Sequence, residues 1–270
     1  MFARNPAFVS SPPDTVFIDI ACIGDKALYN RFGGSSDPQA ETKAINFMDT
    51  IIRRVANFYA PIFNGYNPSA YYYQFRIVTM DVVKDDFPLH GGIYKDIVQF
   101  FRHTDYWKNT YPCANDLPDV IHVFSGHQPG FLYDFDTGKS FYGWSKIHGI
   151  FNENNNSCYP GNSLTVHGNA SNQDSLYNMA LTAHEMGHNF GLVHLEDSAS
   201  CSALCSIQPH LMCESNNNSM LLSSCDYNRL KEVMTNSGLI DCLKPTIQAS
   251  VDTNCTHCHI TFMPMTTPEA

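Results

Sequence analysis

The sequence has few charged residues. Asp, Glu, Lys and Arg make up 16% of its 270 residues, and 26 acids against 16 bases give a net charge of -10. Such an acidic chain is a poor candidate for general binding to nucleic acids or anionic membranes. The sequence also lacks a run of eighteen apolar residues, since the apolar stretch Thr15–Ile23 is interrupted by Asp19. We therefore expect no transmembrane helix.

Several functional motifs are missing as well. The sequence contains no G-x-S-x-G, no Walker motif and no stripe of alternating basic and aromatic residues. Its first residues, MFARNPAFVSSPPD, lack a basic segment followed by an apolar one, so they are not a signal peptide. The hydrophobic fraction of 43% and the length argue against a disordered chain and allow a sizeable core.

Cysteine, in contrast, is abundant. Ten cysteines are many for a cytosolic enzyme of this size, and they predict several disulfides formed in an oxidising compartment. We expect a secreted or extracellular protein, either a mature form or the excised ectodomain of a larger precursor. Four N-glycosylation sequons agree with a secreted glycoprotein, although such triplets also arise by chance. They begin at Asn155, Asn169, Asn217 and Asn254.

Hydrophobic spacing predicts strands and helices that alternate along the chain, which indicates a mixed sheet covered by helices. The expected strands are 15–23, 71–83 and 119–126, and the expected helices are 40–60, 93–101, 171–190 and 227–235. Two further strand-like pieces, 141–147 and 162–168, favour a hairpin at the edge of the sheet.

The stretch HEMGHNFGLVH, residues 184–194, concentrates groups that bind metal. His184 and His188 lie one helical turn apart on the same face, as two ligands of one zinc ion require. Glu185 is placed to act on a water bound to that metal. Gly191 can adopt the left-handed conformation that ends a helix, so the chain can turn and bring His194 back as a third ligand. The fourth position stays open, as in catalytic zinc sites.

The alternative is a polar helix in a chain that holds twelve histidines. A bare HExxH occurs by chance, but HExxHxxGxxH fixes five positions and here follows a helical pattern. With these residues the sequence resembles the metzincin metalloendopeptidases, and within them the reprolysin (adamalysin) branch of snake-venom metalloproteinases and ADAM catalytic domains. The segment AHEMGHNFG, with Asn189 after the second histidine, carries this closer likeness, which extends over residues 14–243.

The resemblance implies an α/β (α+β) zincin fold. An upper subdomain, 14–191, would hold a mixed five-stranded twisted sheet, its helices and the active-site helix. A smaller, irregular, disulfide-bonded lower subdomain would span 192–243. Residues 1–13 are expected to form an N-terminal tail, and residues 244–270 a C-terminal tail or the start of a further domain.

The resemblance also assigns Met212 to a Met-turn, a methionine that packs beneath the ligand histidines. A plain core methionine is the alternative. Glu214 stands where astacins and serralysins usually have a tyrosine ligand, which argues against those branches. The sequence departs from the reprolysin pattern at Leu195, where an aspartate is usual. Glu196 or Asp197 would then take over the role of that aspartate, or the role is absent; the family's cysteine before the methionine is here Cys213, after it.

The activity implied is that of a zinc-dependent metalloendopeptidase acting on extracellular proteins or peptides as a monomer. Glu185 would take a proton from the zinc-bound water and deliver it to the leaving nitrogen. The substrate would pair with an edge strand. Its residues here are Tyr142, Gly143, Trp144, Ser145, Lys146 and Ile147. A catalytically weak zincin scaffold that acts by engaging a partner, as a toxin-like module, is the alternative.

By resemblance, Cys113 should pair with Cys242 and Cys201 with Cys225, whereas Cys158, Cys205 and Cys213 cannot be assigned. Cys22 lies in a buried-looking strand and is expected to be a free thiol.

Some relatives hold a structural calcium ion, and Asp19 occupies a position like that of their acidic ligand on the first strand. Carboxylates that simply face solvent are the alternative. Near the C-terminus, Cys255, Cys258 and His259 form C-x-x-C-H, the attachment signature of c-type haem. The surrounding tail has no helical pattern, which favours a disulfide or the start of a removed domain instead.

Overall fold

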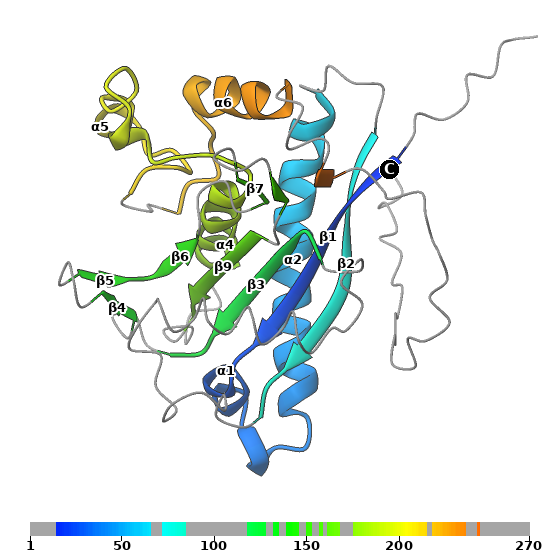
Figure 1. Cartoon of the computed structure of the whole chain (residues 1–270). Coiled ribbons are helices and arrows are strands. Elements are labelled where there is room, and N and C mark those ends of the chain that lie inside the picture. The colour runs from blue at the N-terminus through cyan, green and yellow to red at the C-terminus, as the bar shows by residue number, and fades with distance from the viewer. Residues whose placement is uncertain are drawn as a thin grey trace, which may run out of the picture.

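The computed structural model describes eleven parts of the chain, and it carries the elements labelled in Figure 1. The described residues are 15–65, 72–84, 118–127, 132–134, 139–145, 150–152, 157–158, 161–167, 175–214, 218–235 and 242–243. The strands are β1 (Thr15–Gly24), β2 (Tyr72–Val82), β3 (Val120–Ser125), β4 (Leu132–Asp134), β5 (Lys139–Phe141), β6 (Gly143–Ser145), β7 (Phe151–Asn152), β8 (Ser157–Cys158) and β9 (Gly161–Val166). The α-helices are α1 (Lys26–Arg31), α2 (Ala40–Gly65), α4 (Ser175–Asn189), α5 (Leu204–Ile207) and α6 (Ser224–Thr235).

A mixed five-stranded sheet forms the centre of the molecule, in the order β2-β1-β3-β9-β6. The first four strands are parallel, and β6 runs antiparallel to β9 at the edge (Figure 1). All six residues of β3 are buried, as expected for a strand whose two faces are both covered. The expected α+β architecture with a mixed five-stranded sheet is confirmed, and the two pieces expected to form an edge hairpin are paired in it.

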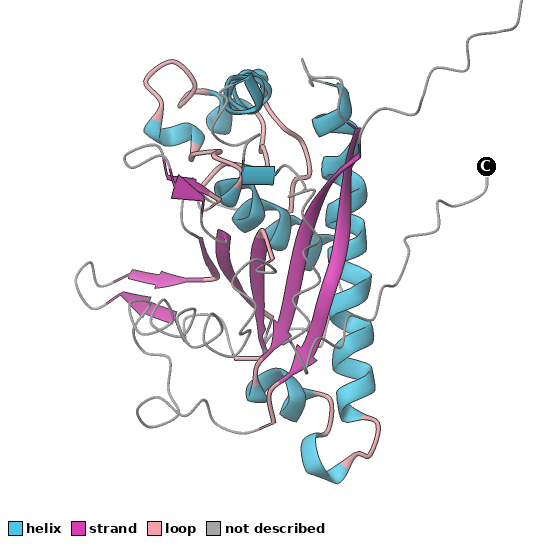
Figure 2. Cartoon of the chain, turned by 45° about the vertical axis from the view of Figure 1, so that its right-hand side comes forward, coloured by secondary structure: helices cyan, strands magenta, loops and turns pink. Residues whose placement is uncertain are grey.

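Two long helices cover one face of this sheet. Helix α2 packs on β1 and β2, α4 packs on β3, β9 and β6, and the two helices contact each other (Figure 2). Aromatic rings fill the junction between α2, β2 and the end of α4. Phe63 lies at the centre of this cluster, with its ring centroid 5.1 Å from that of Phe190 and 5.6 Å from that of Phe75. Edge-to-face pairs of this kind add about 0.5–1.5 kcal/mol each beyond the area they bury.

Helix α2 is longer than the sequence predicted. It continues from the expected end at residue 60 through Pro61 to Gly65. A proline inside a helix removes one hydrogen bond and costs about 3 kcal/mol. The turn beyond it carries Ile62 and Phe63, both buried in the core, and this apolar contact offsets the cost.

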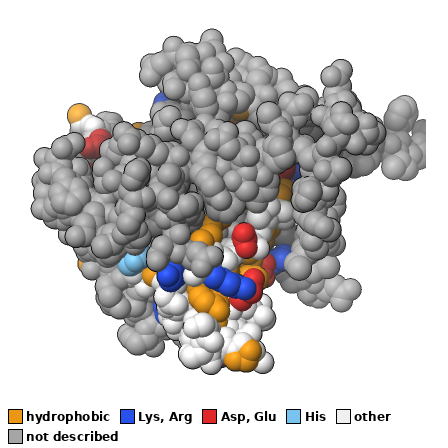
Figure 3. All heavy atoms as spheres, turned by 60° about the horizontal axis from the view of Figure 1, so that its bottom comes forward, with side chains coloured by type: hydrophobic (Ala, Val, Ile, Leu, Met, Phe, Trp, Pro, Cys, Tyr) orange, Lys and Arg blue, Asp and Glu red, His pale blue; other side chains and the backbone are white. Residues whose placement is uncertain are grey.

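Helix α1 was not predicted. Asp25 precedes it and accepts a hydrogen bond from the Leu28 amide at 2.7 Å, the pattern of an N-cap residue. Figure 3 views this end of the molecule and shows basic and acidic side chains side by side. The ion pairs there include Lys43–Asp37 and Lys84–Glu41.

The described part of the C-terminal segment 192–243 is irregular and disulfide-bonded, as expected. Helices α5 and α6 lie beyond the end of the sheet, at the top of Figure 1. Cys201 bonds to Cys225, the pair that the resemblance implied. A second disulfide joins Cys205 to Cys213. Cys22 is buried with a free thiol.

Several sequence predictions fall outside the described residues. These are the tails 1–13 and 244–270 with the C-x-x-C-H motif, the helix 93–101, the start of the helix at 171–174, and Cys113, the proposed partner of Cys242. Cys242 itself is disulfide-bonded. Within the described ranges, no helix is both long and apolar enough to span a membrane.

Candidate metal centre and active site

Three histidines converge at the end of the active-site helix. His184 and His188 lie on α4, and His194 follows it. Their Nε2 atoms form a nearly equilateral triangle with sides of 3.1, 3.2 and 3.2 Å. The first two imidazoles are buried, while 30% of the His194 side chain is exposed, so the cluster opens to solvent at its third member.

The opposite ring nitrogens of two of these histidines are fixed by the backbone. His184 Nδ1 lies 2.6 Å from the Leu211 carbonyl oxygen, and His188 Nδ1 lies 2.8 Å from that of Leu192. A carbonyl oxygen only accepts, so each Nδ1 carries the proton and each Nε2 presents a lone pair. Burial lowers the pKa of His184 to about 4 and that of His188 to about 3, so both rings are neutral near pH 7.

Lone pairs that face one another at 3.2 Å repel unless a cation lies between them. Tetrahedral zinc with Zn–N bonds of about 2.0–2.1 Å requires nitrogens about 3.3–3.4 Å apart, close to the observed triangle. The donor set is one that zinc prefers: three imidazoles, of which those of His184 and His188 are held by backbone carbonyl groups. The residues present therefore fit a zinc ion, held by His184, His188 and His194.

Gly191 makes the turn that brings the third histidine back. Its φ of 90° lies in the left-handed region, where a side chain is strained. Its amide donates to the His188 carbonyl at 2.9 Å, and the Leu192 amide donates to the Gly187 carbonyl at 3.0 Å. These two bonds form a Schellman motif, the usual ending of a helix at glycine.

Met212 lies beneath the helix between the two helical histidines. It is fully buried, and a Cβ added to Gly187 would stand 2.9 Å from its Sδ atom. The Tyr59 hydroxyl, also close to Gly187, donates to the Ala183 carbonyl at 2.7 Å. The Met212 carbonyl accepts from the Leu195 amide at 3.0 Å, so the methionine also holds the segment that follows His194. The assignment of Met212 to a Met-turn stays a prediction.

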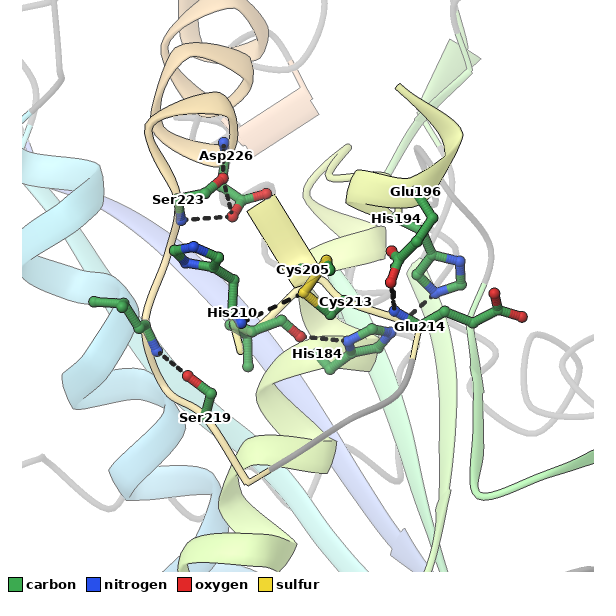
Figure 4. Close-up of a disulfide and its surroundings, with 12 residues drawn as sticks. His184, His194, Glu196, Cys205, His210, Cys213, Glu214, Ser219, Ser223 and Asp226 are labelled. Atoms are coloured by element: carbon green, nitrogen blue, oxygen red, sulfur yellow. Dashed lines mark hydrogen bonds between the residues drawn. A yellow bond between two sulfur atoms is a disulfide. The ribbon is translucent and has the colours of Figure 1, made fainter. Parts of the chain in front are cut away.

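The residues after the third histidine, Leu195, Glu196 and Asp197, make different contacts, and which of them replaces the usual aspartate stays open. Leu195 is buried in the core, where an apolar side chain fits. Both carboxylate oxygens of Glu196 lie 3.1 Å from the Glu214 amide, which ties this segment to the chain beyond Met212 (Figure 4). Asp197 Oδ2 lies 3.9 Å from His194 Nδ1, beyond hydrogen-bond distance.

Glu185 is buried beside the histidines. No described residue donates a hydrogen bond to its carboxylate, and burial raises its pKa well above the ordinary value. The side chain lies against Gly143 at the start of the edge strand, where an added Cβ would meet Glu185 Oε1 at 2.3 Å. A buried carboxyl group whose pKa is raised by burial suits proton transfer.

The proposed substrate strand is partly described. Tyr142 is 52% exposed, and its carbonyl accepts from the Val166 amide at 2.7 Å. Gly143, Trp144 and Ser145 form β6 itself, whereas positions 146–147 (Lys146 and Ile147) lie outside the described residues. The sheet therefore ends at a strand that borders Glu185.

Both carboxylate oxygens of Asp19, the residue considered for calcium, accept from the Arg76 guanidinium at 2.6 Å. Calcium at Asp19 stays a prediction. A second group of metal-binding side chains, Glu196 with Cys205 and Cys213, contains both halves of a disulfide, so neither sulfur is available as a thiolate.

A buried chain of hydrogen bonds, which sequence reasoning missed, connects β3 and β9 to α4. His167 Nδ1 donates to Asn178 Oδ1 at 2.9 Å, so its Nε2 accepts from the Thr165 hydroxyl at 2.6 Å. Thr165 Oγ1 in turn accepts from His122 Nε2 at 2.9 Å, and His122 Nδ1 accepts from Ser163 at 2.6 Å. Burial lowers the pKa of His167 to about 4 and also lowers that of His122.

Comparison with known proteins gives one family match. Residues 150–238 match the family described as "Metallo-peptidase family M12B Reprolysin-like". No curated protein matches the sequence. A solved structure described as "Structure of a chaperone-substrate complex" is 15% identical, with a TM-score of 0.48 over 85% of this chain and 35% of that one. The chain thus spans about a third of that structure's length. The three convergent histidines lie within residues 150–238, the segment that is similar to this reprolysin-like M12B metallopeptidase family.

Proposed function

We propose that the chain is a zinc-dependent metalloendopeptidase that hydrolyses peptide bonds of extracellular proteins or peptides. One observation carries the proposal: three imidazole Nε2 atoms converge within 3.2 Å of one another, and the buried Glu185 directly follows the first of these histidines in the sequence. This combination supplies both a metal-binding group and a proton carrier in one place.

Zinc, when bound, supplies Lewis-acid activation of a water molecule and stabilisation of the negative charge that develops on the substrate carbonyl. His184 and His188 would hold it from helix α4, and His194 would hold it from the chain after the turn. Glu185 takes the proton of the attacking water and passes it to the leaving nitrogen. Met212 and the carbonyls of Leu211 and Leu192 keep the imidazoles in place.

The substrate is proposed to lie in extended form along the edge strand, residues 142–147. Strand β6 is the last strand of the sheet, and main-chain pairing with such an edge fixes a peptide's register. Glu185 contacts the first residue of β6, so a peptide bound there passes the carboxylate. Two disulfides in the lower part of the chain support action outside the cell, where such bonds persist.

The test is a cleavage assay on casein and on a quenched-peptide library. The purified chain should cleave, lose activity when a chelator removes zinc, and regain it when zinc is added back. A zinc-loaded chain that cleaves neither substrate would instead favour a scaffold that acts by binding a partner.

A further inference from the structure

Gly143 and Glu185 approach each other so closely that no side chain fits at position 143. A Cβ built on Gly143 would lie 2.3 Å from Glu185 Oε1 and 2.7 Å from both Cγ and Cδ. Non-bonded carbon atoms pack at about 3.5–4.0 Å, so all three contacts are severe overlaps. Because the overlap involves Cγ as well as the carboxylate, rotation of the carboxylate alone cannot relieve it.

The two backbones that carry these residues are both fixed. Strand β6 pairs with β9 in a regular register, Gly143 with Thr165 and Trp144 with Leu164. Helix α4 is held by the hydrogen bond from Tyr59 to the Ala183 carbonyl and by the packed ring of Phe190. A side chain at position 143 would therefore displace the Glu185 side chain rather than either backbone.

We propose that Gly143 is a positioning residue for Glu185: the missing side chain at the start of β6 keeps open the space that the Glu185 carboxylate occupies during proton transfer. The inference rests on the proposed function. Glycine weakens a strand by roughly 0.5–1 kcal/mol, and inside a strand it often marks a close approach. Here the close neighbour is the proton carrier itself.

The test begins with Gly143→Ala. A displacement of about 1 Å at a reacting group costs on the order of 100-fold in rate, so kcat should fall about 100-fold while KM changes less than threefold. Zinc content should stay at one ion per chain. Gly65→Ala is the matched control, because a Cβ at Gly65 meets no atom within 4 Å. A Gly143→Ala enzyme with wild-type kcat and bound zinc would overturn the proposal.

A double variant separates positioning from general damage to the fold. Glu185→Asp shortens the side chain by one methylene group and vacates the space that a Cβ at position 143 needs. Glu185→Asp should lower kcat strongly in the wild type but little, or not at all, in the Gly143→Ala background. If Gly143→Ala lowers the thermal midpoint, Glu185→Asp should restore it. Losses in kcat that simply multiply, or a midpoint that is not restored, would contradict the proposal.

A crystal structure of zinc-loaded Gly143→Ala gives a readout independent of activity. The Glu185 carboxylate should move by about 1 Å or more, with the three histidines in place. An unmoved carboxylate overturns the inference even in an active enzyme. If the wild type cleaves no peptide while the carboxylate moves as expected, the proposed function fails and the positioning relationship stands.

Discussion

His188 donates from Nδ1 to the carbonyl of Leu192 at 2.8 Å, four residues further along the chain. The same turn that ends the active-site helix at Gly191 therefore also orients a metal-binding imidazole. Folding of the helix end and assembly of the candidate zinc site are one event.

Gly191→Ala should damage both stability and metal binding. A left-handed conformation costs a residue with a side chain about 1–2 kcal/mol, and Gly191 has a φ of 90°. We expect the free energy of unfolding, measured by urea titration, to fall by about that amount, together with a weaker zinc affinity in a chelator competition. Unchanged zinc affinity in a destabilised variant would show that the turn and the site are independent.

His194→Ala should abolish stoichiometric zinc binding, because two imidazoles remain where three are needed. Zinc at 100 times its dissociation constant stabilises a folded protein by about 2.7 kcal/mol, so the wild-type thermal midpoint should rise on zinc addition. The midpoint of His194→Ala should not respond. His127→Ala, which alters a histidine outside the triangle, serves as the control, and a zinc response in His194→Ala would remove His194 from the ligand set.

The disulfides Cys205–Cys213 and Cys201–Cys225 should contribute unequally to stability. Chain-entropy estimates give about 2.5 kcal/mol for the loop closed by Cys205–Cys213, with a sequence separation of 8, and about 3.5 kcal/mol for Cys201–Cys225, with a separation of 24. Paired serine variants compared by chemical denaturation measure both. The Cys205–Cys213 bond adjoins Met212, so its loss should also weaken zinc binding. A larger stability loss for the shorter loop would contradict the loop-closure account and point to contacts that this bond maintains.

Stability should fall as pH decreases through the range set by His167. The pKa of this buried imidazole is lowered from 6.5 to about 4, so the unfolded chain binds its proton first. The contribution of His167 to the free energy of unfolding is complete above pH 6.5 and is lost as pH falls towards 4. It amounts to on the order of 3 kcal/mol. Arg31 and Asp25 act on the same ring, with opposite signs.

His167→Gln removes the titrating group and should flatten the pH dependence of the denaturation midpoint between pH 4 and 6.5. The comparison is the difference in denaturation midpoint between wild type and variant, in which the contributions of histidines that do not interact with His167 cancel. If the denaturation midpoints of the two proteins depend on pH in the same way, groups other than His167 cause the acid sensitivity.

The sequence predicted what depends on contacts local in the chain. The spacing of His184, His188, Gly191 and His194 encodes a helix, a turn and a metal cluster within eleven residues. The helix cap at Asp25 also depends on local contacts, so helix α1 could have been predicted from the sequence. The extension of α2 past Pro61 was not readable, because tertiary packing of Phe63 offsets a local penalty.

Contacts between segments that are distant in the sequence could not be predicted from it. No sequence feature near Gly143 predicts that the side chain of Glu185, 42 residues later, packs against this glycine. The pairing of Cys205 with Cys213 and the chain from His122 to Asn178 likewise depend on how the sheet and helices come together. A single sequence shows which residue types are present, whereas their approach is set by strand order and helix packing.

The central claim is that Glu185 carries the proton in a zinc-dependent peptide hydrolysis. Its most direct test is Glu185→Ala, with zinc content and quenched-peptide cleavage measured on the same preparation. The account predicts one zinc ion per chain and cleavage reduced by two or more orders of magnitude, since loss of a general acid–base costs about 10²–10⁴-fold. Wild-type cleavage by a zinc-loaded Glu185→Ala protein would contradict it.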